Sequence, residues 1–345
     1  MIVPFRIFHF RPWPPMTMPE LKVLRHAVLI GAVFASCAGP APAQSTAAYP
    51  VKPVRFIVPF PAGSGTDIIA RLVAVRLSES LKQQVVIDNR PGASTIIGTD
   101  LVAKAPPDGY TIIIASNNHA INPALFAKLP FDPVKDFAAV GELALLPFIL
   151  VVHPSIPVKS VKDLIALAKA NPGKLTYAST GNGTPPHVAG ELLKQIAKID
   201  IVHVPYKGSA AALTDVVAGQ VPFMFVNTLS SIQYVRAGRL RAIAVGTKNR
   251  ISIMPELPTL IESGVPDFDV ALWAGVLTTA GTPPEIIAKL NREIVAVLAQ
   301  PDVKAKLAAE GAEVMPGTPE EFGALIVSEI DRLGKIARAA KMRVD

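Results

Sequence analysis

Short, continuous apolar runs alternate with segments of helical periodicity along most of the chain. The runs at residues 54–60, 84–88 and 110–116 predict strands, and the segments at 66–82 and 93–104 predict amphipathic helices. Strands that are apolar throughout are typical of a parallel sheet with helices on both faces. This part of the sequence therefore predicts an α/β fold.

The same alternation continues in the second half of the chain. The capping-box pattern Ser160-x-x-Asp163 predicts the start of a helix, and Gly219 and Gly238 are predicted to end two others. Four further strands are predicted between helices, at residues 175–179, 201–206, 221–226 and 240–246. Because no fixed period recurs, the pattern does not match a solenoid.

Two long extended apolar stretches interrupt this alternation, at residues 143–153 and 269–279. We interpret each as a segment that crosses between two structural units. The first unit is then a discontinuous lobe of residues 50–148 plus 272–345, and the second is an inserted lobe of residues 149–271. Two α/β lobes joined by two crossover segments form a hinge with a ligand cleft between them.

The N-terminal residues 1–43 have the pattern of a secretory signal peptide. Basic residues precede a short apolar run at 27–35, and an A-x-A motif ends at Ala43. The apolar run is too short to span a bilayer. We therefore expect export to the periplasm with cleavage near Ala43; the alternative is a lipoprotein acylated at Cys37.

Composition and charge narrow the functional classes. Hydrophobic residues make up 50% of the 345 residues and charged residues 18%, which excludes a disordered chain. The single cysteine, Cys37, excludes a disulfide framework and a cysteine-rich zinc site. The leader contains four basic residues and one acidic residue, so its removal lowers the formal net charge from +7 to +4. A mildly basic exported protein without a basic stripe favours small anionic ligands over nucleic acid.

Small polar residues and glycines follow five of the predicted strands. In an open α/β sheet, ligands bind beyond the carboxyl ends of the strands. The five polar segments are residues 60–67, 116–119, 179–187, 206–209 and 227–228. The first two belong to one predicted lobe and the other three to the second, so we expect a cleft that is lined from both sides.

The first and third of these segments are rich in glycine, and each opens a predicted helix. Glycine allows backbone amides to approach a ligand closely, and a helix N-terminus offers unpaired amides and the positive end of the helix dipole. In the third segment Thr184 is the expected N-cap and Pro185 the first helical residue. Together the two segments predict an anion site that needs no arginine.

Structural roles compete with each of these interpretations. Glycine-rich loops often form tight corners, and a carboxylate such as Asp67 is favoured in the first turn of a helix whether or not it binds a ligand. His119 and His187 are either binding residues or structural histidines, and Lys207 is either a ligand cation or a solvated loop residue. Packing is the expected role of Trp273.

Catalytic and cofactor motifs are absent from the sequence. Gly63-x-Gly65 is followed by Ile68 where a dinucleotide fingerprint needs a third glycine, and neither a P-loop nor an H-E-x-x-H motif occurs. We therefore expect no cofactor, no metal and no enzymatic activity.

Ordered sequence blocks extend over residues 49–340. They are Tyr49-Pro50-x-Lys52-Pro53, Pro59-Phe60-Pro61-Ala62-Gly63-x-Gly65-Thr66-Asp67, Asn89-Arg90-Pro91-Gly92-Ala93, Pro107-Asp108-Gly109-Tyr110-Thr111, Gly183-Thr184-Pro185-Pro186-His187, Val204-Pro205-Tyr206-Lys207-Gly208 and Trp273-x-Gly275. In this order they resemble the substrate-binding receptors of tripartite tricarboxylate transporters, often called the Bug family.

Two positions depart from the usual pattern of that family: Ser94-Thr95 replaces a more usual Gly-Gly, and Val226 stands where many members carry Asp. The second departure disfavours an amino-acid ligand and favours a simpler carboxylate.

The resemblance implies a type II periplasmic-binding-protein fold, in which two α/β lobes close around a small ligand like a Venus flytrap. It also implies that backbone groups of the first and third polar segments bind a carboxylate. The expected site residues are Phe60, Pro61, Ala62, Gly63, Ser64, Asp67, Ser116, His119, Ser179, Thr180, Gly181, Gly183, Thr184, His187, Lys207 and Asn227.

The function that the sequence predicts is that of a periplasmic receptor. It captures a small organic carboxylate for uptake by a tripartite tricarboxylate-type transporter. Two alternatives stay open: a sensor receptor for a membrane signalling protein, and an exported serine hydrolase that uses Ser64 or Ser179 with His119 or His187. No nucleic-acid partner is expected, and a monomer is expected because nothing in the sequence argues for oligomerisation.

Overall fold

The computed structural model describes residues 49–309 and 311–343, which belong to one compact unit. The predicted signal peptide, its cleavage position near Ala43 and the alternative acylation site at Cys37 all lie outside the described residues. Every described helix is too short or too polar to cross a bilayer.

The first lobe begins with alternating strands and helices. These are β1 (Val54–Val58), α2 (Gly65–Leu81), β2 (Val85–Asn89), α3 (Ile96–Ala103), β3 (Thr111–Ser116) and α4 (Asn117–Leu125). β1 lies between β2 and β3 and is parallel to both. The predicted strands and helices are confirmed to within a few residues, except that the helix predicted at 93–104 begins with a 3-10 turn at Ala93–Thr95.

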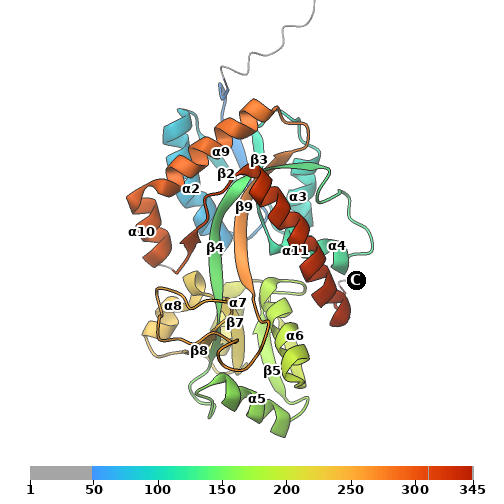
Figure 1. Cartoon of the computed structure of the whole chain (residues 1–345), viewed down its shortest axis with the longest axis vertical. Helices are drawn as coiled ribbons and strands as arrows, with labels where there is room; N and C mark the ends of the chain where they lie inside the picture. The colour runs from blue at the N-terminus through green and yellow to red at the C-terminus, as the bar shows by residue number, and fades with distance from the viewer. Residues whose placement is uncertain (1–48, 310, 344–345) are drawn as a thin grey trace, which may run out of the picture. The chain divides into compact units, whose positions relative to one another are not determined.

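Two long strands connect the lobes, β4 (Phe137–Val152) and β9 (Ala271–Thr279). Up to Pro147, β4 pairs antiparallel with β9, which also pairs antiparallel with β3. From Phe148 onward, β4 pairs antiparallel with strands of the second lobe. Figure 1 shows both strands running from one lobe into the other. The predicted crossover segments are confirmed. Both segments also pair as antiparallel strands within the sheets, so the sheets are mixed, whereas the sequence predicts a parallel sheet.

The second lobe repeats the alternation. It contains α5 (Val161–Ala170), β5 (Leu175–Ser179), α6 (Pro185–Ala197), β6 (Ile201–Pro205), α7 (Ser209–Val217), β7 (Phe223–Asn227), α8 (Thr228–Arg236) and β8 (Arg241–Val245). The predicted helix ends are confirmed, because Ser160 Oγ accepts a hydrogen bond from the Asp163 amide at 3.2 Å and Gly219 and Gly238 adopt positive φ beyond α7 and α8.

After β9 the chain returns to the first lobe. It ends in α9 (Pro284–Ala299), α10 (Pro301–Ala309), the short strand β10 (Glu313–Val314) and α11 (Pro319–Ala339). β10 pairs with β4, and Thr318 and Glu321 form a capping box that starts α11.

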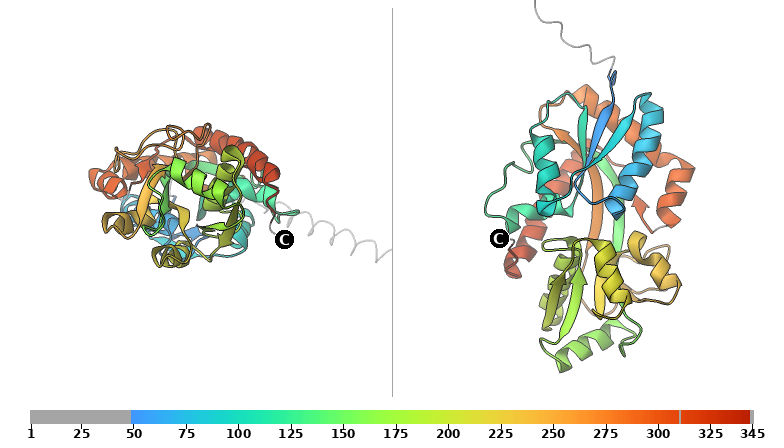
Figure 2. Two further views of the ribbon diagram at one scale, coloured as in Figure 1. Left: turned by 90° about the horizontal axis from the view of Figure 1, so that it is seen from below. Right: turned by 180° about the vertical axis from the view of Figure 1, so that it is seen from behind.

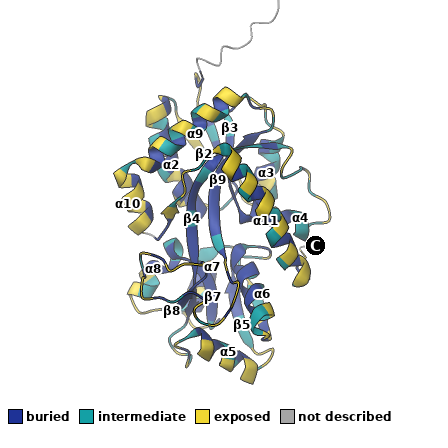
Figure 3. Ribbon diagram, viewed as in Figure 1, coloured by how far each residue is buried: buried dark blue, intermediate teal, exposed yellow. Residues whose placement is uncertain are grey.

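Alternate residues along the strands point to opposite faces of each sheet, and helices cover both faces. On β1, Phe56 packs in the cluster that includes α2 and α9, whereas Ile57 packs with α3, α4 and α11. On β7, Phe225 packs in the cluster of α5 and α6, whereas Val226 packs with α7 and α8. Figure 2 shows helices on both sides of the strands, and Figure 3 shows that the strands are buried. Because helices cover both faces of each sheet, the strands between them are apolar throughout. The ends of the strands remain available for a binding site.

Candidate functional site

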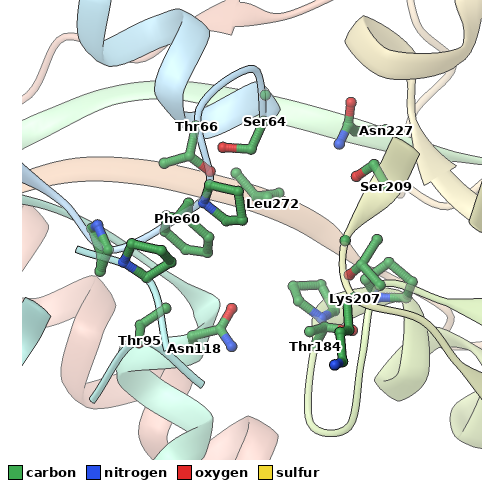
Figure 4. A pocket seen from close by; sticks show the side chains of 18 of the residues that line it. Phe60, Ser64, Thr66, Thr95, Asn118, Thr184, Lys207, Ser209, Asn227 and Leu272 are labelled. Atoms are coloured by element: carbon green, nitrogen blue, oxygen red, sulfur yellow. The ribbon is translucent and has the colours of Figure 1, made fainter. Parts of the chain in front are cut away.

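A cavity of about 590 Å³ lies between the two lobes. It is lined by the segments that follow β1, β2, β3, β5, β6 and β7, and by β4 and β9 where they cross. Figure 4 shows first-lobe side chains opposite those of the second lobe. The lining residues are Pro59, Phe60, Pro61, Ala62, Gly63, Ser64, Gly65, Thr66, Pro91, Gly92, Ser94, Thr95, Asn118, Phe148, Thr180, Thr184, Pro185, Pro186, Lys207, Gly208, Ser209, Ala210, Asn227 and Leu272.

The lining has little charge and a large apolar share. Lys207 is the one charged side chain among the lining residues, and it is exposed. Phe60, Phe148 and Leu272 form apolar walls together with five prolines. No three His, Cys, Asp or Glu residues of the described chain are grouped so that they could hold a metal ion. The cavity therefore suits a small ligand with an anionic group and an apolar body.

The N-terminus of α2 faces the cavity from the first lobe. Ser64 is the N-cap, and its Oγ accepts a hydrogen bond from the amide of Asp67 at 3.2 Å. Gly65 and Thr66, the first two helical residues, line the cavity, and their amides have no intrahelical acceptor. A Cβ atom at Gly65 would lie 3.5 Å from Nδ2 of Asn227, so this helix N-terminus approaches the second lobe closely.

Asp67 lies behind this loop and does not line the cavity. Its buried carboxylate accepts hydrogen bonds from the Gly63 amide at 2.8 Å, from Arg71 Nε at 2.9 Å and from Asn89 Nδ2 at 2.8 Å. Burial by itself would raise the pKa of Asp67, but the hydrogen bonds from Arg71, Asn89 and the Gly63 amide lower it below its usual value. The ionised carboxylate therefore ties the loop to the start of the helix.

In the second lobe, the N-terminus of α7 faces the cavity. Gly208, Ser209 and Ala210 all line the cavity, and no side chain caps this helix. By contrast, α6 begins with Pro185 and Pro186, which carry no amide hydrogen. The third polar segment (residues 179–187) therefore offers fewer amide donors than predicted, and the fourth segment (residues 206–209) offers more.

Gly208 holds the start of α7 in a conformation that suits glycine almost alone. Its φ is 102° and its ψ is 173°, and its amide donates a hydrogen bond to the Thr180 carbonyl at 3.3 Å. We expect Gly208→Ala to lower the free energy of unfolding by about 2 kcal/mol. Ligand binding should weaken roughly fivefold, because the α7 amides and Thr180 would both move. Urea denaturation and calorimetric titration measure these two effects.

Gly238→Ala is the matched control for this prediction. Gly238 also has a positive φ, 68°, and a Cβ atom added to it would meet open space, as it would at Gly208. Unlike Gly208, it lies at the end of α8 and outside the cavity lining. The substitution should cost about 1 kcal/mol of stability and leave ligand affinity unchanged. Equal loss of affinity in both variants would contradict a local role for Gly208.

His119 lies in the core of the first lobe and does not line the cavity. It is 3% exposed, its ring lies parallel to Phe131 and edge-on to Phe137, and its Nε2 is 2.7 Å from the Pro133 carbonyl oxygen. Burial lowers the pKa of His119 to about 4. The neutral ring therefore donates Nε2–H to Pro133, which is a structural arrangement.

Two further histidines support the third polar segment from beneath. The rings of His187 and His203 stack with their centroids 3.8 Å apart. Nδ1 of His187 accepts a hydrogen bond from the Gly183 amide at 3.0 Å, and Nε2 of His203 lies 2.5 Å from Oγ of Ser179. Burial lowers the pKa of His187 to about 4 and that of His203 to about 3. Both rings are thus neutral: His187 accepts the Gly183 amide, and the contact between His203 and Ser179 Oγ holds the start of the segment in place.

The side-chain pairs of the alternative hydrolase do not form among the described residues. Ser64 Oγ caps α2, and the fully buried Ser179 contacts His203 and neither His119 nor His187. A nucleophilic serine needs a base within hydrogen-bond reach and access to a substrate. Neither of these two serines meets both conditions.

The structure brings part of the predicted site together around the cavity. Nine predicted residues line it: Phe60, Pro61, Ala62, Gly63, Ser64, Thr180, Thr184, Lys207 and Asn227. Seven others are not among the lining residues: Asp67, Ser116, His119, Ser179, Gly181, Gly183 and His187. Three of these seven, Asp67, Ser179 and His187, hydrogen-bond to the backbone of a cavity loop and so shape it from behind.

The predicted site does not include the segment that follows β2. Pro91, Gly92, Ser94 and Thr95 nevertheless line the cavity. The signal for them in the sequence is a Pro-Gly pair directly after a predicted strand, which marks a turn at a strand end. Ser209 is also missing from the predicted site, because the anion site was assigned to the start of α6 and not to that of α7.

Comparisons with known proteins agree with these observations. The family described as tripartite tricarboxylate transporter family receptor matches residues 69–342. Protein BugT of Bordetella pertussis is 36% identical over 320 residues, which cover 92% of this chain and 98% of BugT. The solved structure of R. palustris Rpa4515 with adipate is 39% identical with a TM-score of 0.82, and the match covers 86% of this chain and 100% of that one. MatC (Rpa3494) from Rhodopseudomonas palustris with bound malate is 32% identical with a TM-score of 0.78, and covers 84% of this chain and 99% of that one.

These matches extend over most of the chain, including both lobes and the cavity between them. They confirm the type II periplasmic-binding-protein fold that the resemblance implies. Members of this family are periplasmic binding proteins. The chain therefore belongs to the family of tripartite tricarboxylate transporter receptors, which includes the Bug proteins.

Proposed function

We propose that the chain is a periplasmic receptor that captures a small organic carboxylate and delivers it to a tripartite tricarboxylate-type transporter. The observation that carries this proposal is the lining of the cavity: the N-termini of α2 and α7 reach it, Lys207 adds a positive charge, and the lining contains no acidic side chain. Amides at helix N-termini stabilise anions through unpaired donors and the helix dipole. The adipate and malate in the two R. palustris structures support a carboxylate as the ligand.

The proposed contacts to the carboxylate come from both lobes. The amides of Gly65 and Thr66 bind it from α2, and the amides of Ser209 and Ala210 bind it from α7. Asn227 adds a side-chain donor, because its Oδ1 accepts the cap hydrogen bond of α8 and its Nδ2 has no acceptor among the described residues. For the other predicted site residues, we propose ligand contacts where they line the cavity and a positioning role where they lie behind it.

We also propose how the receptor is organised. The first lobe comprises residues 50–148 plus 272–345, the second comprises residues 149–271, and the lobes close on the ligand by bending β4 and β9. A signal peptide of residues 1–43, cleaved near Ala43, directs export, and the receptor acts as a monomer. Its family does not favour the sensor or the serine hydrolase as alternatives.

Thermal unfolding in the presence of carboxylates tests the proposed function. A ligand at a hundred times its Kd that binds only the folded chain adds about 2.7 kcal/mol to the free energy of unfolding. For a chain of this size, the Tm should then rise by about 4 °C. We expect adipate, malate or another small carboxylate to produce this rise, and the corresponding diamides to produce none. A broad panel of carboxylates that leaves the Tm unchanged would contradict the proposal.

A further inference from the structure

The segment that follows β2 has an unusual backbone conformation. Ala93, Ser94 and Thr95 have φ values of 45°, 52° and 77°, so three consecutive residues other than glycine lie in the left-handed region. This conformation is costly, and most of all for a β-branched residue such as Thr95. Strain of this kind persists only where the surrounding structure imposes it, and it concentrates at functional sites.

Hydrogen bonds from α4 impose the conformation. Asn122 Nδ2 donates to the Ser94 carbonyl at 2.7 Å, and Ser94 Oγ donates to Asn122 Oδ1 at 3.1 Å. Asn118 Nδ2 donates to Ser94 Oγ at 3.0 Å. The side chain of Ser94 is thus engaged within the protein, and the next residue along the chain is held against the cavity.

Thr95 differs from Ser94 because its hydroxyl has no hydrogen-bond partner among the described residues. The residue is only 6% exposed, and it lines the cavity. Asn118, which is 3% exposed and also lines the cavity, uses its Nδ2 toward Ser94 and keeps its Oδ1 free of partners in the described chain. Both residues are thus more than nine-tenths buried and line the cavity, and each presents there a polar group without a protein partner among the described residues. A ligand group in the cavity can hydrogen-bond to both.

The two free groups lie apart from the helix N-termini. Figure 4 shows Thr95 and Asn118 on one side of Phe60, and Ser64 and Thr66 on the other. In this view the Phe60 ring thus lies between two polar regions of the same cavity. A ligand that reaches both regions needs a polar group at each end and a hydrocarbon segment between them.

We infer that Thr95 is a specificity-determining residue that, together with Asn118, hydrogen-bonds the oxygen function at the far end of the ligand. That function is a hydroxyl or a carboxyl group, and the inference rests on the proposed function, in which the first carboxylate is bound by the helix N-termini. The strained backbone is retained because it holds the Thr95 hydroxyl in the cavity.

Three ligand series test this inference on the full chain by calorimetric titration. They are straight-chain alkanoates, their ω-hydroxy derivatives and the α,ω-dicarboxylates of matched length. We expect the unsubstituted chain to bind one or both oxygenated series roughly fivefold to tenfold more tightly than the alkanoate of the same length. Thr95→Val should abolish this preference, so that the three series of matched length bind with similar affinity, and Thr95→Ser should retain it.

Thr95→Gly adds a measurement that separates specificity from stability. Glycine relieves the backbone strain, so the Tm should stay unchanged or rise while the preference for oxygenated ligands is lost. Ala93→Gly is the control, because Ala93 shares the left-handed conformation but does not line the cavity, and it should retain the preference. A lower Tm with an unchanged ligand preference in the Thr95 variants would overturn the inference alone. Absence of binding in all three series would overturn the proposed function as well.

Discussion

The Asp67→Ala variant is expected to lose about 3 kcal/mol of unfolding free energy and to bind carboxylates roughly twentyfold more weakly. Asp67 is 1% exposed, and it accepts hydrogen bonds from Gly63, Arg71 and Asn89. Alanine leaves the Gly63 amide without an acceptor among the described residues, whereas Asn89 Nδ2 keeps the Phe60 carbonyl at 3.1 Å and the half-exposed Arg71 can turn to water. An unsatisfied donor in a folded loop costs more than the lost hydrogen bond contributed. Because that donor is the Gly63 amide, the loop before α2 loses its anchor and the helix N-terminus shifts in the cavity. Urea unfolding and titration with a bound carboxylate measure both losses.

Asp163→Ala is the matched control for this variant. Asp163 has the same local arrangement: its amide donates to the N-cap Ser160, and its carboxylate accepts the amide of Lys159, four residues earlier, at 3.0 Å. It is exposed and lies outside the cavity lining. We expect a much smaller loss of stability and no change in affinity. Unchanged affinity in Asp67→Ala itself would show that this carboxylate does not position the loop.

Acidification from about pH 7 to about pH 4 is expected to destabilise the folded chain by about 3 kcal/mol through His119 alone. Burial lowers the pKa of His119 to about 4 in the folded state, whereas an unfolded histidine has a pKa of about 6.5. Below about pH 6.5 the unfolded chain binds a proton that the folded chain does not. Stability is therefore fully present above about pH 6.5, falls as the pH decreases to about 4, and then levels off. Burial also lowers the pKa values of His187 and His203, which act in the same direction.

The His119→Gln variant isolates this contribution. Glutamine retains an amide donor for the Pro133 carbonyl but does not titrate. We expect lower stability at neutral pH, because the ring contacts with Phe131 and Phe137 are lost, and a shallower decrease in stability between about pH 6.5 and pH 4. Chemical denaturation at a series of pH values measures the slope. If the variant keeps the same decrease in stability with pH as the unsubstituted chain, His119 is not the source of that decrease.

Most secondary structure was predictable, because its determinants are local. The strand predicted at 175–179 is β5 at the same residues, and the helix predicted from Ser160 begins at the next residue. A continuous apolar run indicates burial on both faces, and a capping residue satisfies amides within its own turn. These signals need no knowledge of distant segments.

Strand direction was not predictable in the same way. The apolar runs of β4 and β9 show that both strands are buried. Continuous apolar strands are typical of parallel sheets, but burial on both faces does not by itself exclude antiparallel neighbours. The antiparallel pairing of β9 with β3 and β4 follows from the path of the chain between the lobes. That path depends on contacts between segments far apart in the sequence.

The candidate site was predictable at the level of loops but not of side chains. Asp67 and His119 were included in the predicted site because each follows a strand, yet neither side chain lines the cavity, and both hydrogen-bond to other parts of the first lobe. The prolines at 185 and 186 and the left-handed Thr95 change which groups are free to bind. Position in the sequence does not reveal which hydrogen bonds a side chain has already made.

By itself, the sequence determined the alternation of strands and helices, the two crossover segments, the family and the polar segments beyond the strand ends, because each depends on short-range patterns or on ordered motifs. Only the tertiary structure decided which amides and hydroxyls meet in one cavity. Which groups meet depends on contacts between segments far apart in the sequence. Asn122 hydrogen-bonds to Ser94, and Gly65 lies close to Asn227, only because folding brings these segments together.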